Sequence, residues 1–177
     1  MTIGFTLWFT GWSGAGKTTL AIEVEKALKE YGLPYVQRLD GDMIRQSLSR
    51  DLGYTKQDRD ENIRRVTFVA ELLSKNGVAT LVSFISPYRK ARETARSRCH
   101  NFIEIFMKCS PEVLKERDVK GFYQKAKDQQ IQNFTGIDDP YEEPQHPEIT
   151  IDSGKVSVAE ARDLIIHYLE NKRLIGL

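Results

Sequence analysis

Eight consecutive residues, Gly11 to Thr18, have the composition and order of a phosphate-binding loop. They match the pattern GxxxxGK(S/T), follow an apolar run at residues 3–9 and precede a helix-like stretch at residues 19–31. Glycines let successive backbone N–H groups turn toward a phosphate, and the following helix points its positive dipole end at the same place. A chance glycine-rich turn is the alternative, and the full match in this setting argues against it. The pattern therefore predicts binding of a nucleoside triphosphate.

Within this loop, Lys17 is expected to reach the outer phosphates and Thr18 to bind magnesium. The residues expected to contact the nucleotide are Gly11, Trp12, Ser13, Gly14, Ala15, Gly16, Lys17, Thr18 and Thr19.

Two aspartates, Asp40 and Asp42, flank a glycine after a short strand expected at residues 35–39. One carboxylate can accept a hydrogen bond from a magnesium-bound water, and the other can accept a proton from an acceptor hydroxyl. A turn that caps a helix is the alternative, because Asp and Gly are common in turns. Beside a phosphate loop, the chemical interpretation is favoured.

Arginines gather just after these aspartates. Arg59 and Asn62 are three residues apart and so share a helix face. With Arg45 they could hold an anionic, planar acceptor by bidentate hydrogen bonds. For Arg64 and Arg65, a solvated helix surface with Asp/Arg pairs is an equally good interpretation.

Two further features carry polar side chains toward the same region. Ser86 follows a strand and precedes Pro87, where it can contact the transferred phosphoryl group or the acceptor, or cap a helix. Residues 119–147 are polar and lack a strand pattern. So long a connection is typical of a functional lid or binding loop, and disorder is the alternative.

The elements that must position these residues alternate along the chain. Strands are expected at residues 3–9, 35–39, 78–85, 102–107 and 149–151, and helices at 19–31, 58–75, 88–98, 113–118 and 156–172. This alternation predicts an α/β protein with a five-stranded parallel sheet, helices on both faces and a lid, as in the P-loop NTPase fold. Ligands bind beyond the carboxyl ends of such strands, so the polar features above should surround one crevice.

Composition limits the organisation and the partners. The 177 residues are most simply one domain, 1–177, and the 26 basic and 25 acidic side chains give no footprint for nucleic acid or an anionic membrane. The chain shows no membrane-length apolar segment and no targeting peptide, so a cytoplasmic protein is expected. Cys99 and Cys109 form no metal-binding pattern and are expected to be reduced thiols, with a disulfide as the alternative.

In combination, the motifs resemble the adenylylsulfate kinase family, whose members use ATP to phosphorylate the 3′-hydroxyl of adenosine 5′-phosphosulfate. The phosphate loop is common to many NTPases, whereas the other motifs in this order are specific. The resemblance is carried by residues 11–19, 39–42, 58–59, 61–65, 85–89, 117–118, 120–121 and 134–141.

The resemblance implies roles for individual residues. Asp42 would be the base or acceptor-orienting carboxylate, Lys17 would stabilise the transferring group, and Ser86 matches a serine treated in the family as a phosphoserine site. Thr18 and Asp40 would serve Mg²⁺, and Arg117 would join the ATP site. The acceptor would contact Asp40, Asp42, Arg45, Tyr54, Arg59, Asn62, Ile85, Ser86, Lys125 and Phe134, with its adenine between Tyr54 and Phe134. Direct in-line transfer from ATP is preferred to a covalent step, and a homodimer is implied.

Some positions depart from the family pattern. Met43 replaces a polar residue, residues 127–130 replace Arg-x-Gly-Glu, and residues 132–133 replace Lys-Gly. A missing glycine would stiffen the lid, and a missing lysine would weaken acceptor binding. Two other functions stay open: a P-loop kinase for another small acceptor, and a catalytically silent nucleotide-binding module. Intact Lys17, Asp40 and Asp42 argue against the silent module.

Overall fold

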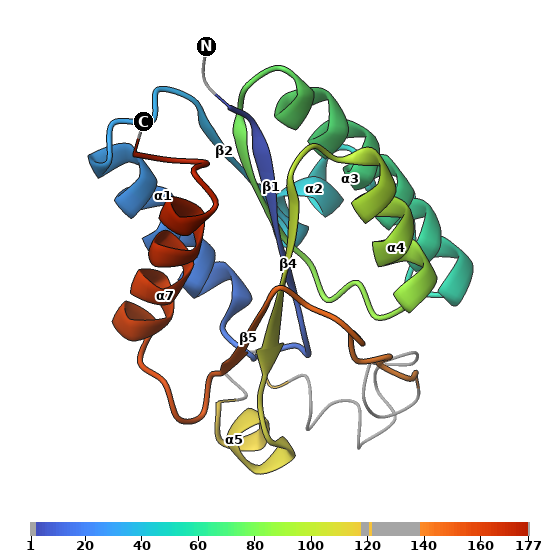
Figure 1. Ribbon diagram of the computed structural model, residues 1–177. Coiled ribbons are helices and arrows are strands. Elements are labelled where there is room, and N and C mark those ends of the chain that lie inside the picture. Colours follow the sequence, from blue (N-terminus) through green and yellow to red (C-terminus); the bar gives the residue numbers. More distant parts are fainter. Residues whose placement is uncertain (1–2, 118–120, 122–138, 177) are drawn as a thin grey trace.

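The computed structural model describes residues 3–117, 121 and 139–176, and within these ranges five parallel strands form one sheet. The strand order is β2-β3-β1-β4-β5, so the strand that leads into the phosphate loop lies at the centre (Figure 1). The strands are β1 (Phe5–Thr10), β2 (Val36–Asp40), β3 (Ala79–Ser83), β4 (Phe102–Lys108) and β5 (Ile149–Asp152). The predicted five-stranded parallel sheet is confirmed.

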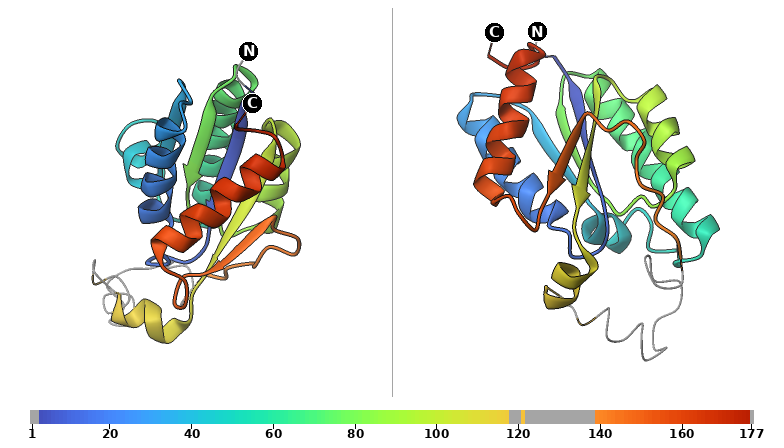
Figure 2. Two further views of the ribbon diagram at one scale, coloured as in Figure 1. Left: turned by 60° about the vertical axis from the view of Figure 1, so that its left-hand side comes forward. Right: turned by 60° about the horizontal axis from the view of Figure 1, so that its bottom comes forward.

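Helices cover both faces of this sheet, as predicted (Figures 1 and 2). Helices α1 and α7 pack together on one face, and α3 and α4 pack together on the other. The helices of the described residues are α1 (Lys17–Glu30), α2 (Gly41–Gln46), α3 (Lys56–Lys75), α4 (Arg89–Arg98), α5 (Pro111–Glu116) and α7 (Val158–Asn171).

Alternating side chains of β1 fill two separate cores. Phe5, Leu7 and Phe9 are buried in the core shared with α1 and α7, whereas Trp8 is buried in the core shared with α3 and α4. A strand buried on both faces has a nearly continuous apolar sequence, which is why β1 and β3 could be located from sequence. The sheet thus holds the C-terminal end of β1 rigidly.

Hydroxyl caps fix where several helices begin. The Ser110 side chain accepts a hydrogen bond from the Val113 N–H, and Pro111 occupies the first turn, as predicted for α5. Helix α3 begins at Lys56, before the expected start at residue 58, because the Thr55 side chain accepts from the Asp58 N–H. The short helix α2 was not predicted.

The end of the expected lid segment returns along α4. Residues 118–120 and 122–138 lie outside the described residues, so most of the lid prediction stays untested. Glu142 N–H donates to Pro87 O at 2.8 Å, and the Glu142 carboxylate accepts from Arg89 N–H at 2.7 Å. The chain is thereby fastened at the start of α4 before it enters β5 (Figure 2).

The described residues also bear on membrane insertion and on the state of the cysteines. None of the helices in the described ranges is both long and apolar enough to cross a membrane. Cys99 and Cys109 are free thiols, as expected. Burial raises the pKa of the Cys99 thiol to about 11.

Candidate active site

The phosphate loop leaves β1 through glycines that no other residue could replace without strain. Gly11 has a φ of 147°, and a Cβ on it would lie 2.5 Å from Met107 O of β4. Gly14 and Gly16 have φ values of 82° and 87°, in the left-handed region, and Gly16 is the N-cap of α1. The loop therefore opens directly onto the N-terminus of α1, the arrangement that favours phosphate.

Lys17 is held against this loop. Its side chain is almost fully buried, and Nζ donates hydrogen bonds to Gly11 O at 2.9 Å and Trp12 O at 2.7 Å. The ammonium group therefore lies beside the loop backbone, where it can neutralise charge on a bound phosphate.

Thr18 and Asp40 meet across the sheet edge. Thr18 Oγ1 donates to Asp40 Oδ2 at 2.7 Å, while Asp40 Oδ1 accepts from the Asp42 N–H at 3.0 Å. Asp40 is thus also the N-cap of α2. The two interpretations of the Asp-Gly-Asp sequence, a helix cap and a site carboxylate, are compatible in one residue.

The donor set at this edge suits Mg²⁺. A hydroxyl and a carboxylate are hard oxygen ligands, and Mg²⁺ is usually bound by one or two protein oxygens together with substrate phosphates and water. Across the described ranges, no three His, Cys, Asp or Glu side chains group together as a cage for a metal ion. The Thr18 hydroxyl and the Asp40 carboxylate therefore fit an ion that arrives with a nucleotide. Asp40 also has a cationic neighbour, because Arg38 Nη1 lies 3.9 Å from Asp40 Oδ2.

Next to this edge, Arg45, Tyr54 and Arg59 form a cationic and aromatic cluster. The centre of the Arg45 guanidinium lies 4.3 Å from the Tyr54 ring centroid, and that of Arg59 lies 5.8 Å from it. Arg45 Nη1 also donates to Leu52 O and Gly53 O. Tyr54 is 56% exposed, so its aromatic side chain is accessible for stacking.

Arg59 and Asn62 share a face of α3, as their spacing predicted, and both side chains are buried there. Asn62 Oδ1 is buried and makes no hydrogen bond to any described residue. A buried amide oxygen without a hydrogen-bond partner lowers the stability of the fold. Such an oxygen is typical of a site that a ligand or water completes.

Arg64 and Arg65 match the alternative interpretation, a solvated helix surface on which arginines pair with acidic side chains. Both pair with Glu61, and Arg65 also binds both carboxylate oxygens of Asp51 at 2.7 and 2.8 Å. Hydrogen bonds from Arg64 and Arg65 lower the pKa of Glu61 to about 2. Arg65 therefore supports the loop between α2 and α3, whereas Arg64 pairs with Glu61 along α3 itself.

Ser86 is buried behind the phosphate loop. Its Oγ accepts a hydrogen bond from Trp8 Nε1 at 3.1 Å and donates to Thr10 Oγ1 at 3.0 Å. Its φ of 41° is in the left-handed region. The N-cap of α4 is Tyr88, so the alternative that Ser86 caps this helix was wrong. Ile85 O accepts from Thr10 Oγ1 at 2.7 Å, which joins this turn to the root of the phosphate loop.

Arg117 lies at the C-terminal end of α5. Its guanidinium donates to Ser153 Oγ at 3.3 Å and to Ser153 O at 2.7 Å. Helix α5 borders the phosphate loop, since a Cβ on Gly14 would lie 3.6 Å from Leu114 Cδ2. Lys125 and Phe134 lie outside the described residues.

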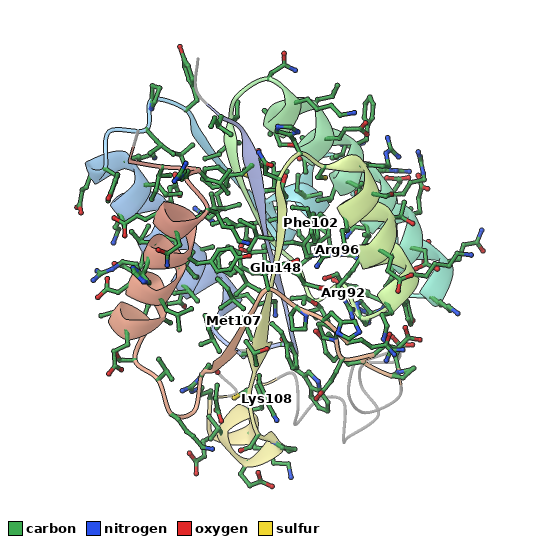
Figure 3. All side chains as sticks on the ribbon, viewed as in Figure 1. Arg92, Arg96, Phe102, Met107, Lys108 and Glu148 are labelled. Atoms are coloured by element: carbon green, nitrogen blue, oxygen red, sulfur yellow. The ribbon has the colours of Figure 1, made fainter. Side chains whose placement is uncertain are left out.

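Sequence reasoning missed a buried ion pair behind the site. Arg92 is 2% exposed, and its Nε donates to Glu104 Oε1 at 2.7 Å. Its other nitrogens donate to Ser86 O and Glu142 O, both at 2.6 Å. Figure 3 shows Arg92 and Arg96 reaching from α4 toward β4 and Glu148. The usable signal was Glu104 itself, an acidic residue in an otherwise apolar strand.

These features define a class of protein. A central phosphate loop, a hydroxyl–carboxylate pair suited to Mg²⁺ and an adjoining arginine cluster are the parts of a P-loop phosphotransferase that takes an anionic acceptor.

Comparison with known proteins identifies the family within that class. A model of the adenylylsulphate kinase family matches residues 3–152. A relative from Halothermothrix orenii named adenylyl-sulfate kinase is 59% identical over 174 residues, which cover 98% of this chain and 94% of the relative. One from Synechococcus with the same name is 52% identical and covers 95% of each chain. The chain belongs to the adenylylsulfate kinase family.

The same family contains a solved structure of similar form. The Mycobacterium tuberculosis APS kinase in complex with AMPPNP and APS matches with a TM-score of 0.91 and 40% identity, covering 96% of this chain and 99% of that chain. The predicted P-loop fold is thereby confirmed.

Proposed function

We propose that this chain is an adenylyl-sulfate kinase, which transfers the γ-phosphate of ATP to the 3′-hydroxyl of adenosine 5′-phosphosulfate and releases ADP. The observation that carries the proposal is the hydrogen bond from Thr18 to Asp40. It joins the phosphate loop to the start of α2, the helix that contains Arg45 of the arginine cluster. The likeness to a kinase structure that holds AMPPNP and APS supports the same pair of substrates.

The residues divide the work of direct transfer. The loop N–H groups and Lys17 bind the outer phosphates of ATP and stabilise the charge that develops there. Asp42 is exposed in the first turn of α2, where it can accept the proton of the acceptor hydroxyl. Thr18 and Asp40 would hold Mg²⁺, which neutralises phosphate charge when bound. Ser86 Oγ is buried, which favours in-line transfer over a phosphoserine step.

On the acceptor side, Arg45, Arg59 and Asn62 bind the phosphosulfate and ribose, and Tyr54 stacks on the adenine. The guanidinium groups suit planar, bidentate recognition of anionic oxygens, and the exposed Tyr54 ring suits a base. Phe134, Lys125 and Arg117 complete the two substrate sites in this proposal. The enzyme acts as a one-domain homodimer in the cytoplasm.

A coupled assay tests the function. ADP release from ATP and Mg²⁺ is measured with adenosine 5′-phosphosulfate and, in parallel, with AMP, adenosine and shikimate. We expect turnover with the phosphosulfate alone, and loss of turnover in Lys17→Ala. Turnover with another acceptor would favour a different P-loop kinase, and nucleotide binding without turnover would favour a silent module.

A further inference from the structure

Asp139 contacts the proposed acceptor site from a distant part of the chain. Its carboxylate accepts from Tyr88 Oη at 2.7 and 2.9 Å, one distance to each oxygen. The same carboxylate lies near Arg59, with Asp139 Oδ2 3.6 Å from Arg59 Nε. Asp139 thus bridges the turn before α4 and the buried face of α3.

Arg59 needs such a partner because it is nearly buried. Burial lowers the pKa of the Arg59 guanidinium, and the charge of Asp139 opposes that shift. A buried cation is tolerated when a carboxylate and hydrogen bonds compensate for lost water. Arg59 Nε also donates to Tyr54 O at 2.9 Å. The inner end of the guanidinium is therefore fixed between a carbonyl and the Asp139 carboxylate.

Tyr88 fixes Asp139 in turn. Its ring is 6% exposed, and Lys56 Nζ lies 5.2 Å from the ring centroid. One hydroxyl that reaches both carboxylate oxygens sets where the carboxylate lies and which way it faces. The order of contacts is Tyr88 to Asp139, Asp139 to Arg59, and, in the proposed function, Arg59 to the acceptor.

We propose that Asp139 is a positioning residue for the acceptor: anchored by Tyr88, it holds Arg59 in the orientation that binds the anionic group of the acceptor. This inference rests on the proposed function. Asp139 does not touch substrate, yet its removal should lower the affinity for the acceptor and leave the affinity for ATP unchanged.

The first test is Asp139→Asn, which keeps the size of the side chain and removes its charge. The KM for adenosine 5′-phosphosulfate should rise about tenfold, which corresponds to a coupling of ordinary size between neighbouring groups, while the KM for ATP stays within about twofold. Asp163→Asn is the control, because Asp163 is an exposed carboxylate on α7, on the opposite face of the sheet from α3. It should leave both KM values unchanged.

A mutant cycle tests whether Asp139 acts through Arg59. In an Arg59→Lys background, Asp139→Asn should change the acceptor kcat/KM by less than about twofold. Tyr88→Phe, which deletes only the anchoring hydroxyl, should raise the acceptor KM in the same direction and should add little to Asp139→Asn. Equal losses for ATP and acceptor, or full additivity with Arg59→Lys, would overturn the proposal.

A binding experiment distinguishes failure of the proposed function from failure of the proposed role of Asp139. Adenosine 5′-phosphosulfate is titrated calorimetrically into the full chain saturated with AMPPNP. If the wild-type chain does not bind it, the proposed function fails and this inference fails with it. If the wild-type chain and Asp139→Asn bind equally tightly, only the role of Asp139 is refuted. Should Asp139→Asn fail to fold, Tyr88→Phe decides the question by the same titration.

Discussion

Among single residues, Ser86 has a hydroxyl whose contacts are explained by a structural role and not by a chemical one. Its Oγ lies between Trp8 Nε1 and Thr10 Oγ1, and the side chain is 2% exposed. Both partners belong to β1, so the hydroxyl fixes the turn after β3 against the strand that leads into the phosphate loop. A role in holding that turn accounts for these contacts without a phosphorylated intermediate.

Ser86→Ala should therefore keep measurable kinase activity and lose stability. Removal of the hydroxyl leaves Trp8 Nε1 without its acceptor, which costs about 1–3 kcal/mol. Urea denaturation and the ADP-release assay measure the two effects on one preparation. Lys17→Ala and Asp42→Ala are the contrasting variants, since they should fold and lack activity. A folded, inactive Ser86→Ala would refute direct transfer.

Local chemistry decided which site residues could be found from sequence. The phosphate loop and Asp40 were singled out because their residue types and spacing suit one chemistry, and the structure places Thr18 in contact with Asp40. Arg92 was not found, because a helix with the sequence RKARETARSR has the charge pattern of a solvated surface. Its burial depends on Glu104 in another element, and no spacing rule relates the two. The chemical roles of all the predicted site residues, those of Lys17, Thr18 and Asp40 included, stay predictions.

At the scale of elements, α4 is fastened to the sheet by charge as well as by apolar packing. Arg92 pairs with Glu104, and Arg96 pairs with Glu148 at 2.5 and 2.8 Å. Glu148 also accepts from the Glu104 N–H at 2.6 Å, just before β5 begins. The pairs therefore join α4, β4 and the segment that follows Asp139.

Arg92→Met should destabilise the protein strongly, by about 3–5 kcal/mol, because it leaves Glu104 as a buried charge without its main partner. The double variant Arg92→Met/Glu104→Gln should recover part of that loss. Free energies of unfolding from guanidinium titrations provide the comparison. Lys90→Met, an exposed cation on the same helix, is the control and should change little. An Arg92→Met variant as stable as Lys90→Met would contradict this account.

The elements themselves were predictable to different degrees. Long helices and buried strands were located within a few residues, because their apolar periodicity extends over several turns or strand repeats. Helix α2 was missed because six residues cannot show that periodicity, and its Met43 is 46% exposed. Its start was nevertheless visible as the Asp40 cap.

For the whole molecule, nucleotide binding and folding are linked. A ligand that binds only the native state at one hundred times its Kd adds about 2.7 kcal/mol of stability. For a chain of this size, that corresponds to a rise in Tm of roughly 5–10 °C. We expect AMPPNP with Mg²⁺ to produce such a shift in a thermal melt and Lys17→Ala to abolish it. An equal shift in Lys17→Ala would show that the nucleotide binds elsewhere.

The strand order also has a consequence for how the protein is made. Strand β1 is paired on its two sides by β3 and β4, which both come much later in the sequence. Gly11 rests against the backbone of Met107, near the end of β4. On the ribosome, the phosphate loop is synthesised before β3 and β4, so the surface that shapes it is absent until β4 is complete. The nascent chain therefore carries its most recognisable motif without a shaped phosphate loop throughout the synthesis of the segment from α1 to β4.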